Sequence, residues 1–141
     1  MKQLLLIAIS IFAITTIGCS QKINVPPAVT KAFNNKYSGA TNVKWGKESA
    51  KEYEAEFKLN GNNVSANFGT GGTWVETETV MKVTDLPTAV VAAIKKDYPG
   101  AVISVAEKLE EPGGKLLYET VIKVKGKKKT LEMNADGSLA K

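Results

Sequence analysis

The sequence VPPAVTKAFNNKY at residues 25–37 recurs as LPTAVVAAIKKDY at residues 86–98 of this 141-residue chain. The two stretches align without a gap, and the following pairs are identical: Pro26/Pro87, Ala28/Ala89, Val29/Val90, Ala32/Ala93 and Tyr37/Tyr98. An internal duplication of this kind requires each copy to form the same supersecondary unit. It determines the architecture better than the chemistry, because the matched positions are mostly apolar residues, Gly and Pro.

Each copy begins with the pattern of an amphipathic helix. Asn24 or Asp85 can cap it, and the prolines that follow suit a first helical turn. The apolar residues then recur at helical spacing on one face: Val29, Ala32, Phe33 and Tyr37 in the first copy, and Val90, Ala93, Ile94 and Tyr98 in the second. Gly39 and Gly100 are expected to end the two helices.

After each helix the hydrophobic period changes from 3.6 to 2, which indicates strands. The strands expected in the first copy span residues 41–45, 53–59, 64–68 and 74–81, and those in the second span 102–108, 118–124, 131–133 and 138–140. The sequence therefore predicts an α+β fold of two tandem repeats, residues 21–82 and 83–141. Each repeat is one helix packed on a four-stranded antiparallel meander.

A single helix covers only one face of each sheet, and an antiparallel sheet tolerates the other face open. The residues expected on the open face alternate with the apolar ones: Glu54, Glu56, Ser65, Asn67, Trp74, Glu76 and Glu78 in the first copy, and Glu119, Val121, Lys123, Thr130 and Glu132 in the second. On the last strand of the first copy, Val75, Thr77, Thr79 and Met81 form an equally regular set, so the side taken by Trp74 stays open.

This combination of two Pro-x-Ala-Val…Tyr-(Ser/Pro)-Gly-Ala helices, each followed by four strands, resembles the PepSY-like proteins of Bacteroidetes. Residues 84–101, the Asp136-Gly137 turn and the Gly72–Glu78 strand carry the resemblance most clearly, and it extends over residues 25–141. These proteins are also described as similar in fold to beta-lactamase inhibitory protein.

The resemblance implies a small exported protein without enzymatic activity. Related PepSY domains are thought to bind or restrain proteases, and the inhibitory protein covers the rim of an enzyme's active site with its concave sheet. Its contact loops have no matching motif in this sequence, so no contact residue is carried over. The resemblance leaves the target open.

The first twenty residues have the pattern of a signal peptide. Lys2 precedes a ten-residue apolar run, residues 4–13, which is too short to span a membrane. Gly18-Cys19 resembles the end of a lipobox, and Cys19 is the only cysteine. We therefore predict a lipoprotein of the periplasm, anchored by acyl chains on Cys19. The alternative is cleavage after Ser20, which would release a soluble periplasmic or secreted protein.

The composition excludes several functions. The chain has no His, which removes Ser-His-Asp and Cys-His catalysis, and no imidazole or free thiolate is left for zinc. It also has no Arg, so although the net charge is +5, nucleic-acid recognition is disfavoured. We expect the basic run at residues 125–129 to form a solvated hairpin tip, with contact to anionic lipid as the alternative.

The carboxylate pairs Glu54/Glu56 and Glu76/Glu78 allow three interpretations. At roughly 10 Å apart across the sheet they could support acid/base hydrolysis, but the face is expected to be shallow. They could instead bind calcium, although no EF-hand-type loop is present. The third interpretation is a solvated acidic face. Trp45 and Trp74 occur in the first copy alone, so each is either a binding anchor or a filler of a gap in the core.

From these observations we predict a non-enzymatic binding module without cofactor or metal, whose open face binds an envelope protein, with a protease or other hydrolase as one possible target. The residues predicted to bind this partner are Trp45, Glu54, Glu56, Asn67, Trp74, Glu76 and Glu78. The alternatives are a small-molecule or calcium site on the same face, or a structural spacer in the envelope.

Overall fold

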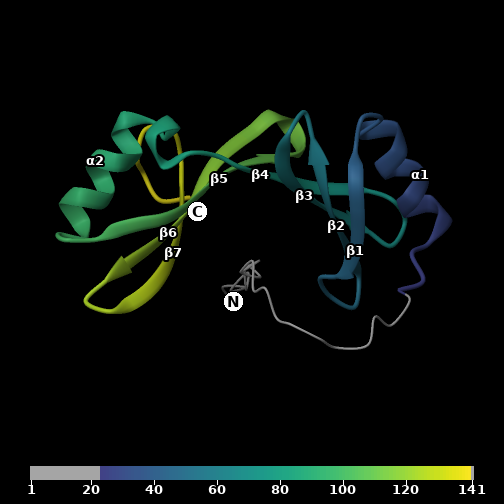
Figure 1. The fold of residues 1–141 in the computed structure, drawn as a ribbon, viewed down its shortest axis with the longest axis horizontal. Coiled ribbons are helices and arrows are strands. Elements are labelled where there is room, and N and C mark those ends of the chain that lie inside the picture. Colours follow the sequence, from purple (N-terminus) through teal and green to yellow (C-terminus); the bar gives the residue numbers. More distant parts are fainter. Residues whose placement is uncertain (1–22, 141) are drawn as a thin grey trace, which may run out of the picture.

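A computed structural model describes residues 23–140, which form one seven-stranded antiparallel sheet with two helices on a single face (Figure 1). The strand order in the sheet follows the chain order without exception. The elements are α1 (Pro27–Lys36), β1 (Thr41–Lys47), β2 (Glu52–Leu59), β3 (Asn62–Gly69), β4 (Trp74–Val80), α2 (Thr88–Asp97), β5 (Val102–Glu111), β6 (Lys115–Val124) and β7 (Lys127–Met133). The α+β class is confirmed.

The helices begin at proline. Pro26 and Pro87 occupy the N-cap positions, and neither helix has a side-chain cap, so the prediction that Asn24 and Asp85 cap them is wrong. The fixed φ of proline and its missing N–H suit this position without any capping group. Each helix is followed by a tyrosine at its C-cap position, Tyr37 after α1 and Tyr98 after α2. The backbone N–H of each tyrosine donates to the carbonyl four residues earlier.

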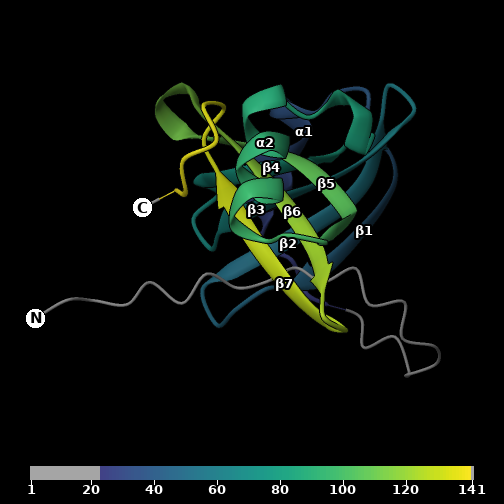
Figure 2. The same ribbon diagram turned by 90° about the vertical axis from the view of Figure 1, so that its left-hand side faces the viewer.

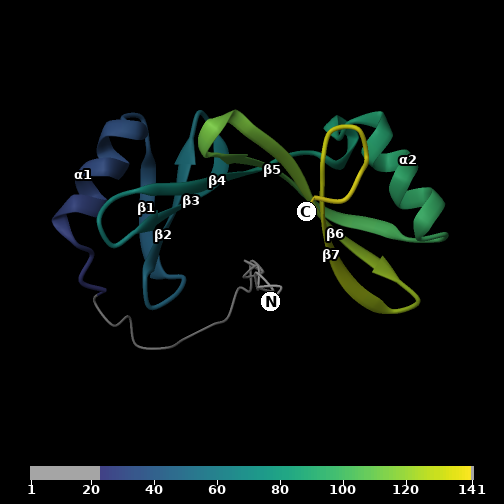
Figure 3. The same cartoon turned by 180° about the vertical axis from the view of Figure 1, so that it is seen from behind.

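The two copies share one sheet. β4 pairs antiparallel with β5 through residues 77–80 and 107–110, and the connection between them carries α2. Figure 2 shows both helices above the sheet, and Figure 3 shows the sheet bending between them, with α1 over β1 and β2 and α2 over β6 and β7. Within residues 23–140, the opposite face of the sheet carries no helix.

The second copy is shorter than predicted. Its expected fourth strand, residues 138–140, is only an isolated bridge between Met133 and Leu139. The residues before it form a tight turn around Gly137, in which the Asn134 N–H donates to the Ser138 carbonyl, so pairing with β7 is limited to this bridge in the described part of the chain. The prediction of four strands is therefore correct for the first copy and wrong for the second.

Two hydrophobic clusters fill the space between the helices and the sheet. The first is largely aromatic and contains Val29, Phe33, Tyr37, Tyr53, Ala55, Phe57, Val64, Ala66 and Phe68. The second is aliphatic and contains Leu86, Val90, Ile94, Ala106, Ile122, Leu131 and Met133. Equivalent helix positions, Phe33 and Ile94, are 3% and 1% exposed, so the helix stripes face the core as predicted.

The same glycine contact fixes each helix to its sheet. Gly72 has φ +86° and Gly137 has φ +85°, which side-chain-bearing residues rarely adopt. A Cβ added to Gly72 would lie 2.5 Å from the carbonyl oxygen of Ala28, and one added to Gly137 would lie 2.5 Å from that of Ala89. Only glycine lets these turns approach the helix backbone so closely.

Across residues 23–140, no helix combines the length and apolar character needed to cross a membrane. The predicted signal peptide and Cys19 lie outside the described residues.

Candidate functional site

The helix-free face is built from rows of side chains that run across the strands. Paired residues of antiparallel strands point to the same side of a sheet, so the register determines which residues share the face. The first row joins Gly46, Glu54, Asn67 and Glu76; the second joins Lys44, Glu56, Ser65, Glu78, Leu109 and Leu117; the third joins Val80, Glu107, Glu119 and Glu132. Every row crosses at least three strands.

Glutamate dominates this surface. Nine glutamates point from it, and together they are called the acidic face below: Glu52, Glu54, Glu56, Glu76, Glu78, Glu107, Glu111, Glu119 and Glu132. The lysines that the register places on the same side are at its margins: Lys44, Lys58, Lys115, Lys123 and Lys128. The centre of the face is therefore negative, although the whole chain carries a net charge of +5.

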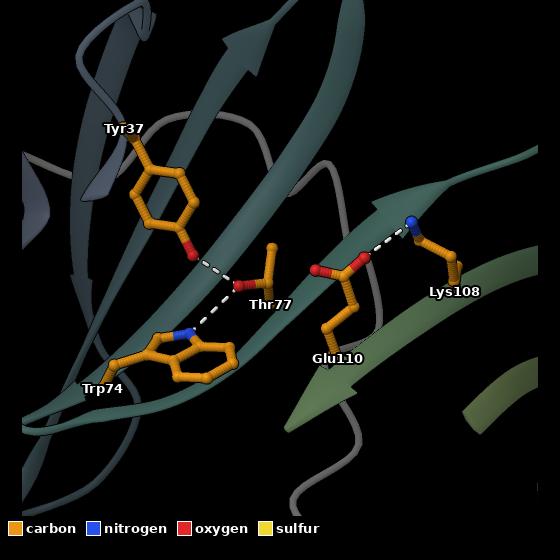
Figure 4. Close-up of polar contacts among 5 residues, drawn as sticks. All are labelled: Tyr37, Trp74, Thr77, Lys108 and Glu110. Carbon is orange, nitrogen blue, oxygen red and sulfur yellow. Dashed lines mark hydrogen bonds and ion pairs between the residues drawn. The ribbon is translucent and has the colours of Figure 1, made fainter. Parts of the chain in front are cut away.

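The central carboxylates are buried. Glu78, Glu107 and Glu119 are 9%, 7% and 5% exposed. Within residues 23–140 there are two ion pairs, and neither involves these three: Lys115 pairs with Glu111 at the margin of the acidic face, and Lys108 pairs with Glu110 on the helix face, with Nζ and Oε1 2.6 Å apart (Figure 4). Burial of carboxylates without a cation is unfavourable unless they hold protons or meet an external partner.

Burial and mutual repulsion raise the pKa values of these carboxyl groups. Burial raises the pKa of Glu78 to about 8, and the neighbouring charges of Glu107, Glu76 and Glu119 add to the effect. Burial likewise raises the pKa of Glu54 and that of Glu119 to about 7. The pKa values of three further members, Glu76, Glu107 and Glu132, are also raised, with burial as the first cause. Glu54, Glu78 and Glu119 therefore hold protons near neutral pH.

Two polar side chains on β3 donate hydrogen bonds to the glutamates of β4. The Ser65 hydroxyl donates to Glu78 Oε2 at 3.2 Å, and Asn67 Nδ2 donates to Glu76 Oε1 at 2.9 Å. Asn67 is only 4% exposed, and its Oδ1 is buried without a hydrogen-bond partner among the described residues. An unpaired buried acceptor is costly, and such groups in native proteins call for an explanation.

Five of the seven residues predicted to bind a partner share the acidic face: Glu54, Glu56, Asn67, Glu76 and Glu78. Trp74 does not, and its predicted place on the open face is wrong. The register shifts between Asn67 and Phe68, so Trp74 pairs with the core residue Phe68 and its side chain joins the helix face. Such a shift is a β-bulge, which redirects a side chain.

On the helix face, Trp74 belongs to a polar cluster that holds α1 to the sheet. Its Nε1 donates to Thr77 Oγ1 at 3.0 Å, and the same hydroxyl is hydrogen-bonded to that of Tyr37 (Figure 4). The ammonium group of Lys36 lies 3.6 Å from the centre of the Trp74 ring, a cation–π contact. These contacts favour the interpretation that Trp74 fills the gap beside α1.

Trp45 also lies on the helix face. It pairs with Ala55 of the core, and its ring packs edge-on against Phe33 with centroids 5.2 Å apart. Neither tryptophan can therefore act together with the glutamates on the helix-free face.

Sequence reasoning missed Glu107 and Glu111 on β5. The expected strand ended at Lys108, whereas β5 runs to Glu111. Glu107 lay inside the expected strand but was not assigned to the open face, and the alternation of Glu107, Leu109 and Glu111 was the available signal. No group of three or more Cys, Asp or Glu within residues 23–140 is arranged to hold a metal ion.

The fold thus defines a class: α+β proteins in which a duplicated helix-and-meander unit forms one sheet with a helix-free face. The model of the family described as putative beta-lactamase-inhibitor-like, PepSY-like matches residues 20–65 and 51–140. The chain belongs to this family, and the resemblance inferred from its helix and turn motifs is confirmed.

Solved structures from Bacteroides have the same fold. A BLIP-like protein from Bacteroides fragilis is 25% identical, with a TM-score of 0.72 and coverage of 86% of both chains. A DUF2874 family protein from Bacteroides ovatus is also 25% identical, with a TM-score of 0.73 over 84% of this chain and 86% of that one. A protein from Bacteroides eggerthii described as a putative periplasmic protein is 20% identical, with a TM-score of 0.73 over 84% and 87%. No curated protein matches the sequence.

Proposed function

We propose that this protein is a non-enzymatic binding module that holds a protein partner against its acidic face. The observation that carries the proposal is the arrangement of nine glutamates on the helix-free face, with the lysines of that face at its margins. A broad, shallow surface of one charge suits a protein better than a small molecule, which needs a concave and mostly apolar pocket.

The family supports this function. Its description is beta-lactamase-inhibitor-like, and one similar structure is of a BLIP-like protein. By extension, the partner of this chain is a protease or another hydrolase that is restrained by binding. The lack of any His in the sequence agrees with a role in which the chain binds an enzyme and performs no catalysis itself.

The location proposed for this interaction is the periplasm, where an acylated Cys19 would anchor the protein to a membrane. The signal-peptide pattern of residues 1–20 and the periplasmic description of the Bacteroides eggerthii structure support that location. Metabolic labelling with a fatty-acid analogue tests the anchor: the label should appear on the wild-type protein and be absent from Cys19→Ala.

Photocrosslinking in the host cell tests the partner-binding face. A photoreactive amino acid at Glu56 or Glu132 probes the acidic face, and one at Glu110 is the matched control, because it replaces a glutamate on the helix face of the same sheet. We expect one crosslinked partner from both acidic-face positions and none from Glu110. Crosslinking from Glu110 alone, or from no position in a folded protein, would contradict the proposal.

A further inference from the structure

We propose that the row formed by Glu54, Asn67 and Glu76 is a subsite for the guanidinium group of an arginine on the partner protein. This inference rests on the proposed function, because it names the chemical group that the acidic face receives. The other occupants of such a subsite, a lysine ammonium group or a neutral side chain, are distinguished by the experiment below.

The three side chains lie next to one another on neighbouring strands. Glu54 of β2 pairs with Asn67 of β3, which in turn pairs with Glu76 of β4. Adjacent strands are about 4.8 Å apart, so a single planar group can reach across the row. The row ends at Gly46 on β1, whose missing side chain leaves its outer end free.

The Asn67 amide has one acceptor that is not used within the described residues. Its Nδ2 donates to Glu76 Oε1 at 2.9 Å, so the amide is fixed and Oδ1 lies at its other corner. That Oδ1 is the buried acceptor without a partner, in a residue that is only 4% exposed. A group that donates to Oδ1 would therefore relieve an existing desolvation cost as well as form a hydrogen bond.

The chemistry of the row selects guanidinium. An Asn oxygen and two carboxylates make a row of acceptors, and the planar fork of arginine offers five N–H donors that can serve an amide and a carboxylate together. Glu48, Glu52 and Glu111 add negative potential at these residues, so a cation is favoured over a neutral donor. The chain contains no Arg, so the group has to come from a different protein.

The second copy provides an internal contrast. Glu119 corresponds to Glu54 and Glu132 to Asn67, so a carboxylate stands where the first copy has Asn67, and no described strand supplies a counterpart of Glu76. The row that contains these two glutamates attracts cations, but it lacks the amide oxygen that would accept a hydrogen bond from a guanidinium N–H. Discrimination between arginine and lysine is therefore expected in the first copy only.

A titration of the full-length protein followed by NMR tests the subsite. The probes are acetyl-arginine methylamide, its lysine counterpart, and the citrulline counterpart, which has the shape of arginine without its charge. The arginine probe should shift the side-chain amide signal of Asn67 and the backbone signals of its row. The lysine probe should bind about tenfold more weakly, and the citrulline probe should cause no shift.

Variants locate the binding. Glu54→Gln keeps the shape of the row and should weaken arginine binding about tenfold, whereas Glu110→Gln on the helix face should leave it unchanged. Equal binding of citrulline, equal binding of lysine, or an unchanged affinity in Glu54→Gln would each overturn the subsite. If acidic-face crosslinking succeeds while the arginine probe fails, the subsite is wrong and the proposed function survives. If the arginine probe binds as expected but crosslinking from the acidic face fails, the proposed function is wrong and the subsite survives.

Discussion

The two copies place equivalent residues at equivalent positions but fill their cores differently. Phe33 in the first corresponds to Ile94 in the second, Phe57 to Ile122, and Phe68 to Met133. Because every one of these residues is buried in its copy, the repeat specifies which positions face the core and leaves the volume at each free to vary. The first copy has the bulkier core and the full four strands, and it also carries the Asn67 row.

The largest effect is expected from truncating the central helix residue of each core. Phe33→Ala should lower the free energy of unfolding by about 4 kcal/mol, and Ile94→Ala by about 3 kcal/mol, because the aromatic ring leaves the larger cavity. Urea unfolding followed by circular dichroism measures both.

Since β4 and β5 join the copies, each variant should still unfold in a single transition. Separate transitions for the two copies would show that the shared sheet does not couple them.

The next effect, comparable to that of Ile94→Ala and nearly equal in the two copies, is expected at the glycines that contact the helices. Gly72→Ala and Gly137→Ala should each destabilise by about 3 kcal/mol, because the new Cβ would meet a helix carbonyl at 2.5 Å in an unfavourable backbone conformation. Gly61→Ala is the control, since its φ is +84° but no atom lies within 4 Å of the added Cβ.

That control should cost about 1 kcal/mol in the same thermal or urea experiment. If Gly72→Ala cost no more than Gly61→Ala, the close approach to the helix would not matter to stability.

The smallest effect concerns the acidic face that the two copies share, and it depends on pH. The raised pKa values mean that the folded protein retains protons which the unfolded chain has already released above pH 4.5. The free energy of unfolding should therefore fall as the pH rises from about 5 to about 8. Glu78→Gln, which cannot ionise, should raise the stability at pH 8.5 by about 2 kcal/mol and leave it nearly unchanged at pH 4.

Thermal melts from pH 4 to pH 9 measure this change, with Glu110→Gln as the control on the helix face. Stability that increases toward pH 8 in the wild-type protein would contradict the sign of the shifts.

The sequence was sufficient for features that recur in both copies. The helix stripes and the alternation along each strand, which puts Glu54, Asn67 and Glu76 on the open side of their own strands, follow from periodicity, because each is a local property of one element. The side of the sheet taken by Trp74 could not be predicted, since both alternating sets on β4 are regular and the bulge that decides between them arises from pairing with β3. The pairing of β4 with β5 could not be predicted from periodicity either, because it joins strands on either side of α2 in the chain.

The strictly sequential strand order has a consequence for how the chain acquires its structure. Each strand from β2 to β7 pairs with the strand that immediately precedes it, and only between β4 and β5 does a helix, α2, intervene. Each strand pairing other than β4–β5 therefore closes a short stretch of chain, and short loops cost less entropy to close. As a nascent chain lengthens, the sheet can grow by one strand at a time, and β4 presents an unpaired edge until α2 and β5 have been synthesised.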